Sequence, residues 1–325
     1  MTARRTPAAV PAPTRRLRRL PAPVLFLAGG TSMYLGAALA VGLFDRLAPH
    51  AVAELRLIGA ALVLLAWRRP GRAAWAGRAG RRRLLLATVF GLATALMNVA
   101  YYEAIARLPL GTAVALEFCG PVVVAAVASR RPRDVAAVVM AAAGVLLIAD
   151  VRWSGSPSGV LWALAAAAMW AAYVLLGKRV ARGGNGIDDL AVGFTAAAVL
   201  LSPLLLTGGV HGFAPLADPA VLGMAVGLGV LSSVIPYVLD QVVLRRVGQA
   251  RFAVLLALLP VTATIVGFAA LGQLPGALEI GGIAAVIAAV ALRSRDGDEP
   301  PPGADASSSR SVTDDRPAHG LPGAV

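Results

Sequence analysis

Glu117 is the residue of this sequence whose position most directly suggests chemistry, because it lies in the middle of the apolar stretch TAVALEFCGP at 112–121. If this stretch crosses a membrane, a charge there costs about 2.5–3.5 kcal/mol at the bilayer centre, which makes the side chain a candidate functional group. Glu117 could face a central cavity and bind a proton or a cation. It could instead pair with an arginine or a backbone amide and hold helices together.

Asn98, Tyr102 and Glu103 form a second polar group inside an apolar stretch. Asn98 and Tyr102 are four residues apart and share one helical face, whereas Glu103 is rotated by about 100° from Tyr102. A polar face on an otherwise apolar helix is expected to point inward. Glu103 lies near the end of its stretch, where a solvated carboxylate and a buried one are both open.

Two closely spaced pairs have more than one interpretation. Glu54 and Arg56 are two residues apart and cannot face each other on a helix. Arg56 is therefore expected to reach the membrane surface or to pair with a carboxylate of another helix, a structural role, although it is also a candidate for substrate binding. Trp170 and Tyr173 are three residues apart, which suits packing or an interfacial belt as well as contact with a substrate.

The second half of the chain has a comparable polar face. Ser233 and Tyr237 lie one turn apart, and Asp240 shares this face less closely. Asp240 could line a cavity, or it could simply neutralise Arg245 or Arg246.

The elements that carry these residues must lie in a membrane. The chain has 325 residues, of which 58% are hydrophobic and only 14% charged, with a mean hydropathy of +0.74. Soluble domains have about 25% charged residues, so the composition excludes a water-soluble globular protein. A span needs about 20 apolar residues, so the region between the polar ends could hold about ten to twelve spans.

Apolar runs separated by Gly, Pro or charged residues predict ten transmembrane helices. Their approximate bounds are 24–43, 51–67, 84–105, 111–128, 134–149, 159–176, 189–206, 220–241, 250–271 and 276–292. The basic N-terminal segment 1–22 and the C-terminal tail 295–325 are expected to be disordered, because their composition cannot bury enough apolar surface.

The distribution of basic residues supports this count. With both termini in the cytoplasm, 26 of the 30 Lys and Arg residues fall in the N-terminal lead, the inner loops and the C-terminal tail. Outer loops contain Arg46, Arg107 and Arg152, and Arg56 lies within a helix. Cytoplasmic loops retain basic residues, so the alternation predicts ten helices in a multi-pass protein of the inner membrane.

The ten helices divide into two units of five, 23–150 and 151–294. A shift of 139 positions places Pro121 on Pro260 and Arg107 on Arg246, with few other identities. An odd number of helices inserts the second unit in the opposite sense, which predicts an inverted repeat with substrate bound near the midplane. Pro121 and Pro260 are expected to bend their helices at matching depths.

Three stretches, ALMNVAYYEAIARLPLGTAVALEFCGPVVVAAVASRRP, AAMWAAYVLLGKR and LSSVIPYVLDQVVLRRV, resemble the EamA-type drug/metabolite transporter superfamily, and most closely its threonine and homoserine exporter branch. The resemblance covers roughly residues 24–292. It implies a ten-helix exporter of small polar metabolites, commonly amino acids, driven by the proton gradient.

The family pattern, carried over residue by residue, falls on residues already singled out and on a few neighbours. They are Asn98, Tyr102, Glu117, Gly120, Pro121, Trp170, Tyr173, Pro236 and Tyr237. Asp240 keeps an acidic residue where the family has one. Leu259 and Gln273, however, occupy positions where the exporter branch typically has acidic residues, and Glu103 stands where a small or neutral residue is expected.

A proton-coupled secondary transporter is therefore the leading hypothesis. Its partners are a small-molecule substrate, the lipid bilayer and a proton gradient, with no nucleic acid and either a monomer or a homodimer. An importer, a transporter of another metabolite, a channel and a membrane scaffold remain alternatives. One cysteine, Cys119, and three scattered histidines give no disulfide, no metal site and no cofactor, and an enzyme is not expected.

Overall fold

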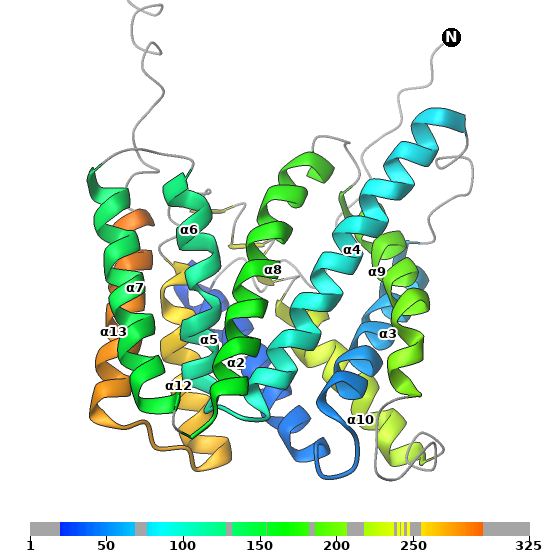
Figure 1. Cartoon of the computed structure of the whole chain (residues 1–325). Coiled ribbons are helices and arrows are strands. Elements are labelled where there is room, and N and C mark those ends of the chain that lie inside the picture. Colours follow the sequence, from blue (N-terminus) through cyan, green and yellow to red (C-terminus); the bar gives the residue numbers. More distant parts are fainter. Residues whose placement is uncertain are drawn as a thin grey trace, which may run out of the picture.

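The computed structural model describes residues 20–68, 77–127, 132–153, 155–181, 186–206, 218–236, 239–240, 242–243, 246–247 and 255–294. Within these ranges the chain is helical apart from short connections and contains no strand (Figure 1). The predicted all-α class is confirmed. The two terminal segments expected to be disordered lie outside the described residues, except for residues 20–22.

The described residues of the first half form six helices, because one predicted helix is divided. They are α2 (Ala22–Leu43), α3 (Pro49–Arg68), α4 (Gly77–Ile105), α5 (Leu110–Glu117), α6 (Cys119–Val127) and α7 (Pro132–Trp153). The boundary predicted at residue 150 falls inside α7. Helix α7 ends at Trp153, and the next helix begins at Pro157.

The described part of the second half also contains distorted segments. Its elements are α8 (Pro157–Ala181), α9 (Gly186–Leu201), the 3-10 helix η2 (Ser202–Leu205), α10 (Pro219–Gly229), the π-helix η4 (Val230–Val234), α12 (Leu258–Leu271) and α13 (Ala277–Ser294). Each of the ten predicted apolar runs overlaps one or more of the described helices.

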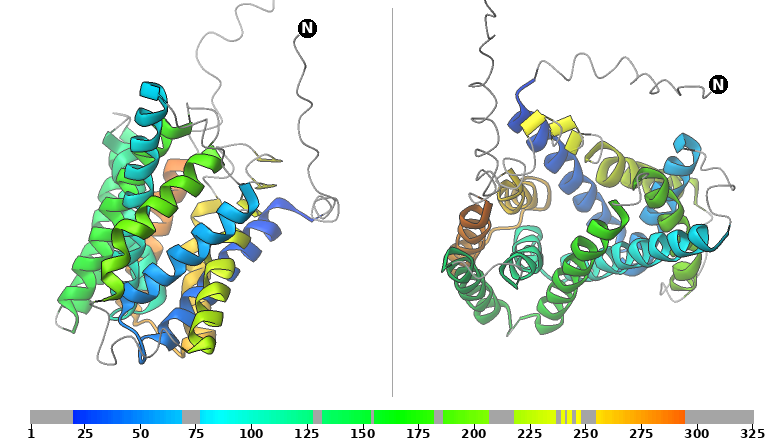
Figure 2. Two further views of the ribbon diagram at one scale, coloured as in Figure 1. Left: turned by 90° about the vertical axis from the view of Figure 1, so that its right-hand side faces the viewer. Right: turned by 90° about the horizontal axis from the view of Figure 1, so that it is seen from above.

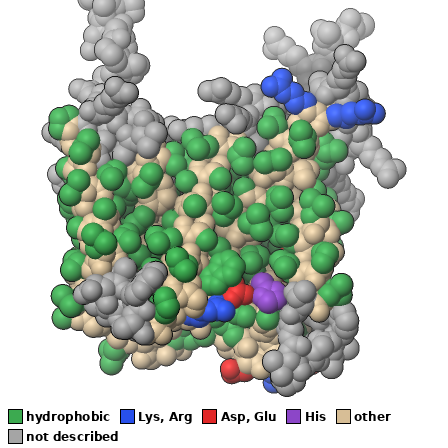
Figure 3. All heavy atoms as spheres, viewed as in Figure 1, with side chains coloured by type: hydrophobic (Ala, Val, Ile, Leu, Met, Phe, Trp, Pro, Cys, Tyr) green, Lys and Arg blue, Asp and Glu red, His purple; other side chains and the backbone are tan. Residues whose placement is uncertain are grey.

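Five helical stretches of the described residues are long and apolar enough to cross a membrane: Ala22–Leu43, Pro49–Trp67, Gly80–Ile105, Pro157–Leu176 and Asp188–Leu205. Five shorter apolar stretches accompany them: Leu110–Val124, Val135–Ile148, Pro219–Val234, Leu258–Leu271 and Ala277–Leu292. Hydrophobic side chains cover the middle of the face in Figure 3, while charged side chains gather at its upper and lower edges. This pattern is that of a multi-pass membrane protein.

Two helix interruptions lie at corresponding places in the two halves. The helical pattern breaks at Phe118, between α5 and α6, and at Ala257, just before α12. Each break precedes a proline by three residues, Pro121 in one case and Pro260 in the other. Proline has no N–H, so the carbonyls four residues earlier, those of Glu117 and Leu256, lose their intrahelical donor. The two breaks are separated by the same 139 residues as the prolines.

The helices pack in two groups that each draw on both halves (Figure 2). One group contains α5, α6, α7, α12 and α13, and the other contains α3, α4, α9 and α10. Helix α8 packs against α4, α5 and α6, while α2 packs against α12, α10 and η4. Helices α2 and α8 therefore connect the two groups.

Small residues allow the tightest of these contacts. A side chain at Gly91 of α4 would collide with the backbone of Gly193 in α9, and one at Gly120 of α6 with the carbonyl of Ala167 in α8. Close backbone approach at small residues is typical of helices packed in membranes, where apolar burial between helices gains little against lipid.

Candidate functional site

A central cavity of about 500 Å³ lies between the two helix groups. This size is in the range of small-molecule sites. Its lining reaches Leu64 and Trp67 in the last turns of α3 and Leu190 near the start of α9. Toward the opposite end it stops at Ala37 of α2 and Tyr102 of α4. The cavity therefore extends toward the end of the bundle where α3 ends and α4 begins, which we call the basic end because residues 68–83 contain seven arginines.

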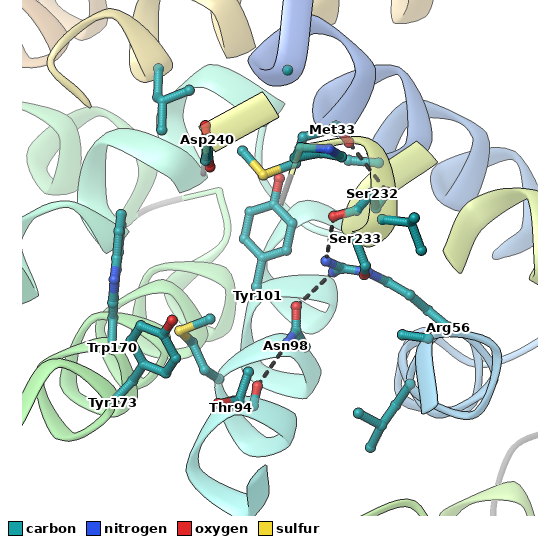
Figure 4. A pocket seen from close by; sticks show the side chains of 18 of the residues that line it. Met33, Arg56, Thr94, Asn98, Tyr101, Trp170, Tyr173, Ser232, Ser233 and Asp240 are labelled. Atoms are coloured by element: carbon teal, nitrogen blue, oxygen red, sulfur yellow. Dashed lines mark hydrogen bonds between the residues drawn. The ribbon is translucent and has the colours of Figure 1, made fainter. Parts of the chain in front are cut away.

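Arg56 of α3 is held against the cavity wall by neutral groups from two other helices (Figure 4). Its Nη1 donates to Asn98 Oδ1 at 2.6 Å and its Nη2 to the Ser232 carbonyl at 3.0 Å, while Nε lies 3.3 Å from Ser233 Oγ. The guanidinium also lies 5.7 Å from the ring centre of Tyr102, a cation–π arrangement. Among the described residues it has no carboxylate partner within 4 Å. The structure therefore does not contain the expected ion pair, and the charge of Arg56 faces the cavity.

Asn98 is oriented by its own helix so that it can accept from Arg56. Its Nδ2 donates to the Thr94 carbonyl one turn earlier at 2.7 Å, which directs Oδ1 toward the guanidinium (Figure 4). Tyr102, predicted on the same face, lies beneath Arg56 and is fully buried. The predicted polar face of α4 thus points inward.

Glu117 is the last residue of α5 and lines the cavity directly before the helix break. It is 9% exposed and has no hydrogen-bond or ion-pair partner among the described residues. A structural pairing of Glu117 with an arginine or an amide is therefore not what the structure contains. The cavity instead presents an acidic group from α5 and a basic group from α3.

Aromatic side chains of α8 form another part of the wall. Trp170 packs edge-on against Phe118 with ring centres 4.6 Å apart, and Tyr173 stacks on Phe90 at 4.8 Å. Both residues line the cavity (Figure 4). Packing and cavity lining, which the sequence left as alternatives, therefore occur together.

The π-helix η4 supplies backbone acceptors to the site. A wider helical turn leaves carbonyls without their usual partners, and such turns are frequent at functional sites. Ser32 of α2 donates to the Leu231 carbonyl at 2.9 Å, and Arg56 donates to the Ser232 carbonyl. The Ser232 hydroxyl in turn donates to the Met33 carbonyl at 3.3 Å. Helices α2 and α3 thus both bind the distorted segment.

Asp240 lies on the cavity wall and forms no ion pair with another described residue. Arg246, one of its two expected partners, donates to the Leu20 carbonyl at 2.7 Å, while Arg245 lies outside the described residues. Tyr237, the other predicted residue of this segment, also lies outside the described residues.

Glu103 lies outside the cavity lining and belongs to a separate cluster near the end opposite the basic end. Its carboxylate accepts from Arg107 at 2.5 Å and lies 2.9 Å from Nδ1 of His50. It is 6% exposed. Of the two alternatives left open by the sequence, the structure contains the buried carboxylate, paired with two basic groups.

The two departures from the family pattern have local explanations. Leu259 lines the cavity and packs against Gly30 of α2, where its Cδ2 lies 2.9 Å from the place of an added Cβ. Gln273 accepts a hydrogen bond from the backbone N–H of Leu110, at the start of α5, at 2.8 Å. Its amide oxygen therefore does what a carboxylate oxygen would do at this helix N-terminus.

Several cavity residues were not singled out from the sequence. Met33, Tyr34, Thr94 and Tyr101 all line the cavity. Tyr34 and Tyr101 are hydroxyl-bearing aromatic residues within apolar runs, which is a signal that could have identified them. Met33 and Thr94 have no such signal in the sequence.

Comparison with known proteins decides the family. Residues 157–295 match the model of the EamA-like transporter family. A threonine/homoserine exporter RhtA of Salmonella typhimurium (strain SL1344) is 35% identical over 284 residues, covering 86% of this chain and 93% of the relative. The RhtA of Escherichia coli (strain K12) is 32% identical over 269 residues, covering 82% and 88%. The chain belongs to the EamA-like transporter family.

The fold is similar to that of a solved structure. That structure, described only as a crystal structure of a protein, matches with a TM-score of 0.52 over 83% of this chain and 97% of its own, at 20% identity. The family resemblance predicted from the sequence is confirmed. The chain is a multi-pass EamA-like transporter of the inner membrane and not an enzyme, as its relatives are exporters. Among the described residues, no group of His, Cys, Asp and Glu could hold a metal ion.

Proposed function

We propose that this transporter exports small zwitterionic metabolites, amino acids of the threonine and homoserine type, by proton-coupled alternating access. The observation that carries the proposal is the pair of opposite charges on the cavity wall, Arg56 and Glu117, neither of which has an oppositely charged partner among the described residues. The names of the curated relatives support the substrate class.

An α-amino acid matches this pair of charges. Its carboxylate can accept two parallel hydrogen bonds from a guanidinium, and its ammonium can bind a carboxylate. Arg56 is already fixed by Asn98 and by η4, so little side-chain freedom is lost when it binds. A short hydroxylated side chain could then lie near Ser233, with Trp170 and Tyr173 limiting its size.

Glu117 supplies the coupling in this mechanism. An unpartnered carboxylate in a membrane interior is costly, so Glu117 favours binding of either a proton or the substrate ammonium. Competition between these two cations for one carboxylate links their movements, because each must leave before the other binds. Substrate would move out as protons move in.

The arrangement of the helices supports an inverted repeat as the moving framework. Helix α4 packs on α8 and α9, and its counterpart in the second half, α10 with η4, packs on α2 and α3. Helices α5 and α6 pack on α8 as α12 packs on α2. Exchanging the halves thus preserves these four sets of contacts, and the matching breaks at Phe118 and Ala257 give each half a place to bend.

The charge distribution supports an orientation with both termini in the cytoplasm. The basic end then faces the cytoplasm, and the cavity, which extends toward this end, would take up substrate from inside the cell. A reporter fused after Arg295 should behave as cytoplasmic. Periplasmic behaviour of this fusion would refute both the orientation and the inverted repeat.

Transport in reconstituted vesicles tests the proposed function. Purified full-length protein should accumulate labelled threonine or homoserine against its concentration gradient when a pH gradient is imposed, and a proton ionophore should abolish the accumulation. Arg46→Gln, which removes an exposed ion pair with Asp218 at 3.6 Å, is the matched control and should transport normally. Flux that only equilibrates the solute, with or without a pH gradient, would contradict proton coupling and favour a channel.

A further inference from the structure

Glu54 of α3 is a buried carboxyl group that the proposed mechanism does not use. It is 1% exposed, it does not line the cavity, and neither of its oxygens has a hydrogen-bond partner among the described residues. A buried polar group without a partner costs free energy, and an anion costs far more than a neutral acid. The smallest ligand that removes this cost is a proton.

A titratable group lies one helical turn from Glu54, toward the end of the bundle opposite the basic end. His50 precedes Glu54 by four residues and therefore lies on the same face of α3. Its side chain is 24% exposed, and its Nδ1 lies 2.9 Å from a carboxylate oxygen of Glu103. Arg107, 36% exposed, binds the other oxygen of Glu103 at 2.5 Å. Exposure thus falls from Arg107 and His50 to Glu54.

We propose that Glu54 is a second proton-binding site, separate from the transport cavity, which exchanges protons with the medium at this end through His50. The proposal rests on the proton-coupled transport proposed above. Glu54 is well placed for this role because the residue before it, Ala53, and the residue one turn further, Leu57, both line the cavity. The site therefore lies between the outer medium and the cavity wall.

The proposed step transfers one proton from His50 to Glu54. A protonated His50 releases its proton and becomes a neutral imidazole, while the Glu54 carboxylate takes up the proton and becomes a carboxylic acid. Glu103 remains an anion throughout, paired with Arg107, and holds the imidazole in place. Transfer in the reverse direction returns the proton to the medium.

Other charged groups on the elements packed against α3 are already paired or lie elsewhere. At the same end, Asp218 before α10 pairs with Arg46, and Glu103 of α4 belongs to the cluster itself. At the basic end, Asp189 of α9 pairs with Arg83 at 2.6 Å, and Asp188 of α9 and Arg81 and Arg82 of α4 lie at the same end. Tyr101 and Tyr102 of α4 contribute buried hydroxyl groups. The described residues of η2 and η4 contain no ionisable side chain, and α2 contributes only the hydroxyl of Tyr34.

Infrared difference spectra of the full-length protein in lipid vesicles, recorded between acid and alkaline pH, test the site directly. A buried carboxylic acid without hydrogen bonds has a distinct C=O stretching band. We expect Glu54→Gln to remove one such band, different from the band that Glu117→Gln removes, and the control Arg46→Gln to remove none. An unchanged spectrum of Glu54→Gln would overturn the proposal.

The role of His50 requires a second variant in which Glu54 is intact. In His50→Gln the Glu54 band should persist, but the pH at its midpoint should change. An unchanged midpoint would overturn the proposed link between the two residues. Failure of this proposal can be distinguished from failure of the proposed function. The Glu54 band can be present even if wild-type vesicles show no flux driven by a pH gradient.

Discussion

The two halves of the molecule have similar packing but different chemistry, as Glu117 and Leu256 illustrate. The two residues are 139 positions apart, each precedes a helix break by one residue, and both line the cavity. The first half contributes Arg56, Asn98 and Glu117 to the wall. The described part of the second half contributes backbone carbonyls, Ser233, aromatic rings and Asp240. The two halves therefore contribute different kinds of groups to the cavity wall.

The two halves also differ in which helix carries the small residue at a close contact. In the contact between α6 and α8 the small residue is Gly120 of α6, which approaches the Ala167 carbonyl. In the matching contact between α12 and α2 the small residue is Gly30 of α2, against which Leu259 of α12 packs. The small residue thus lies on α6 in the first contact and on α2 in the second.

The largest expected effect on binding is that of Arg56→Gln. If the guanidinium binds the substrate carboxylate, its loss should cost about 1.5–3 kcal/mol of binding free energy, or roughly 10- to 100-fold in Kd. Calorimetry with an amino acid and with the matching amine, which lacks the carboxylate, measures this cost. Only the amino acid should be affected. An equal loss for both ligands would mean that Arg56 only holds α4 and η4 together.

Gly120→Val tests the packing asymmetry. The added side chain must displace the Ala167 backbone, so we expect a loss of about 1–3 kcal/mol in the free energy of unfolding. Gly223→Val is the matched control, because an added Cβ at Gly223 meets no atom within 4 Å. Thermal unfolding in detergent should separate the two variants. Equal midpoints would show that α6 and α8 tolerate greater separation.

Ser32→Ala should have the smallest effect. Removing the donor to the Leu231 carbonyl of the π-helix should lower the free energy of unfolding by about 0.5–1.5 kcal/mol. Ser202→Ala, whose hydroxyl makes an exposed bond to the Val199 carbonyl, is the control and should cost less. Unfolding curves of both variants measure the difference. An equal effect would mean that the π-helix does not depend on α2.

The sequence indicated where the described helices lie, because apolar runs and basic loops report on membrane insertion. It also indicated several residues that line the cavity, since polar side chains within such runs seldom face lipid. Among them are Arg56, Asn98, Tyr102, Glu117, Trp170, Tyr173, Ser233 and Asp240.

The partners of these residues could not be predicted in the same way. Helical spacing gives the face of a residue but not the helix that this face meets. Arg56 therefore appeared to need a carboxylate, whereas packing gives it Asn98 and the carbonyl of Ser232. Glu103 appeared close to the polar face of α4, but its 100° rotation directs it to His50.

We expect Glu117, and not Leu256 at the corresponding position of the second half, to couple solute movement to protons. The deciding measurement is uptake driven by a pH gradient in reconstituted vesicles, per folded molecule, for wild type, Glu117→Gln and Leu256→Gln. The amide keeps the shape of the Glu117 side chain, so the protein should insert normally. We expect Glu117→Gln to abolish net uptake and Leu256→Gln to retain it. Unchanged coupled flux in Glu117→Gln would show that Glu117 does not carry the proton coupling.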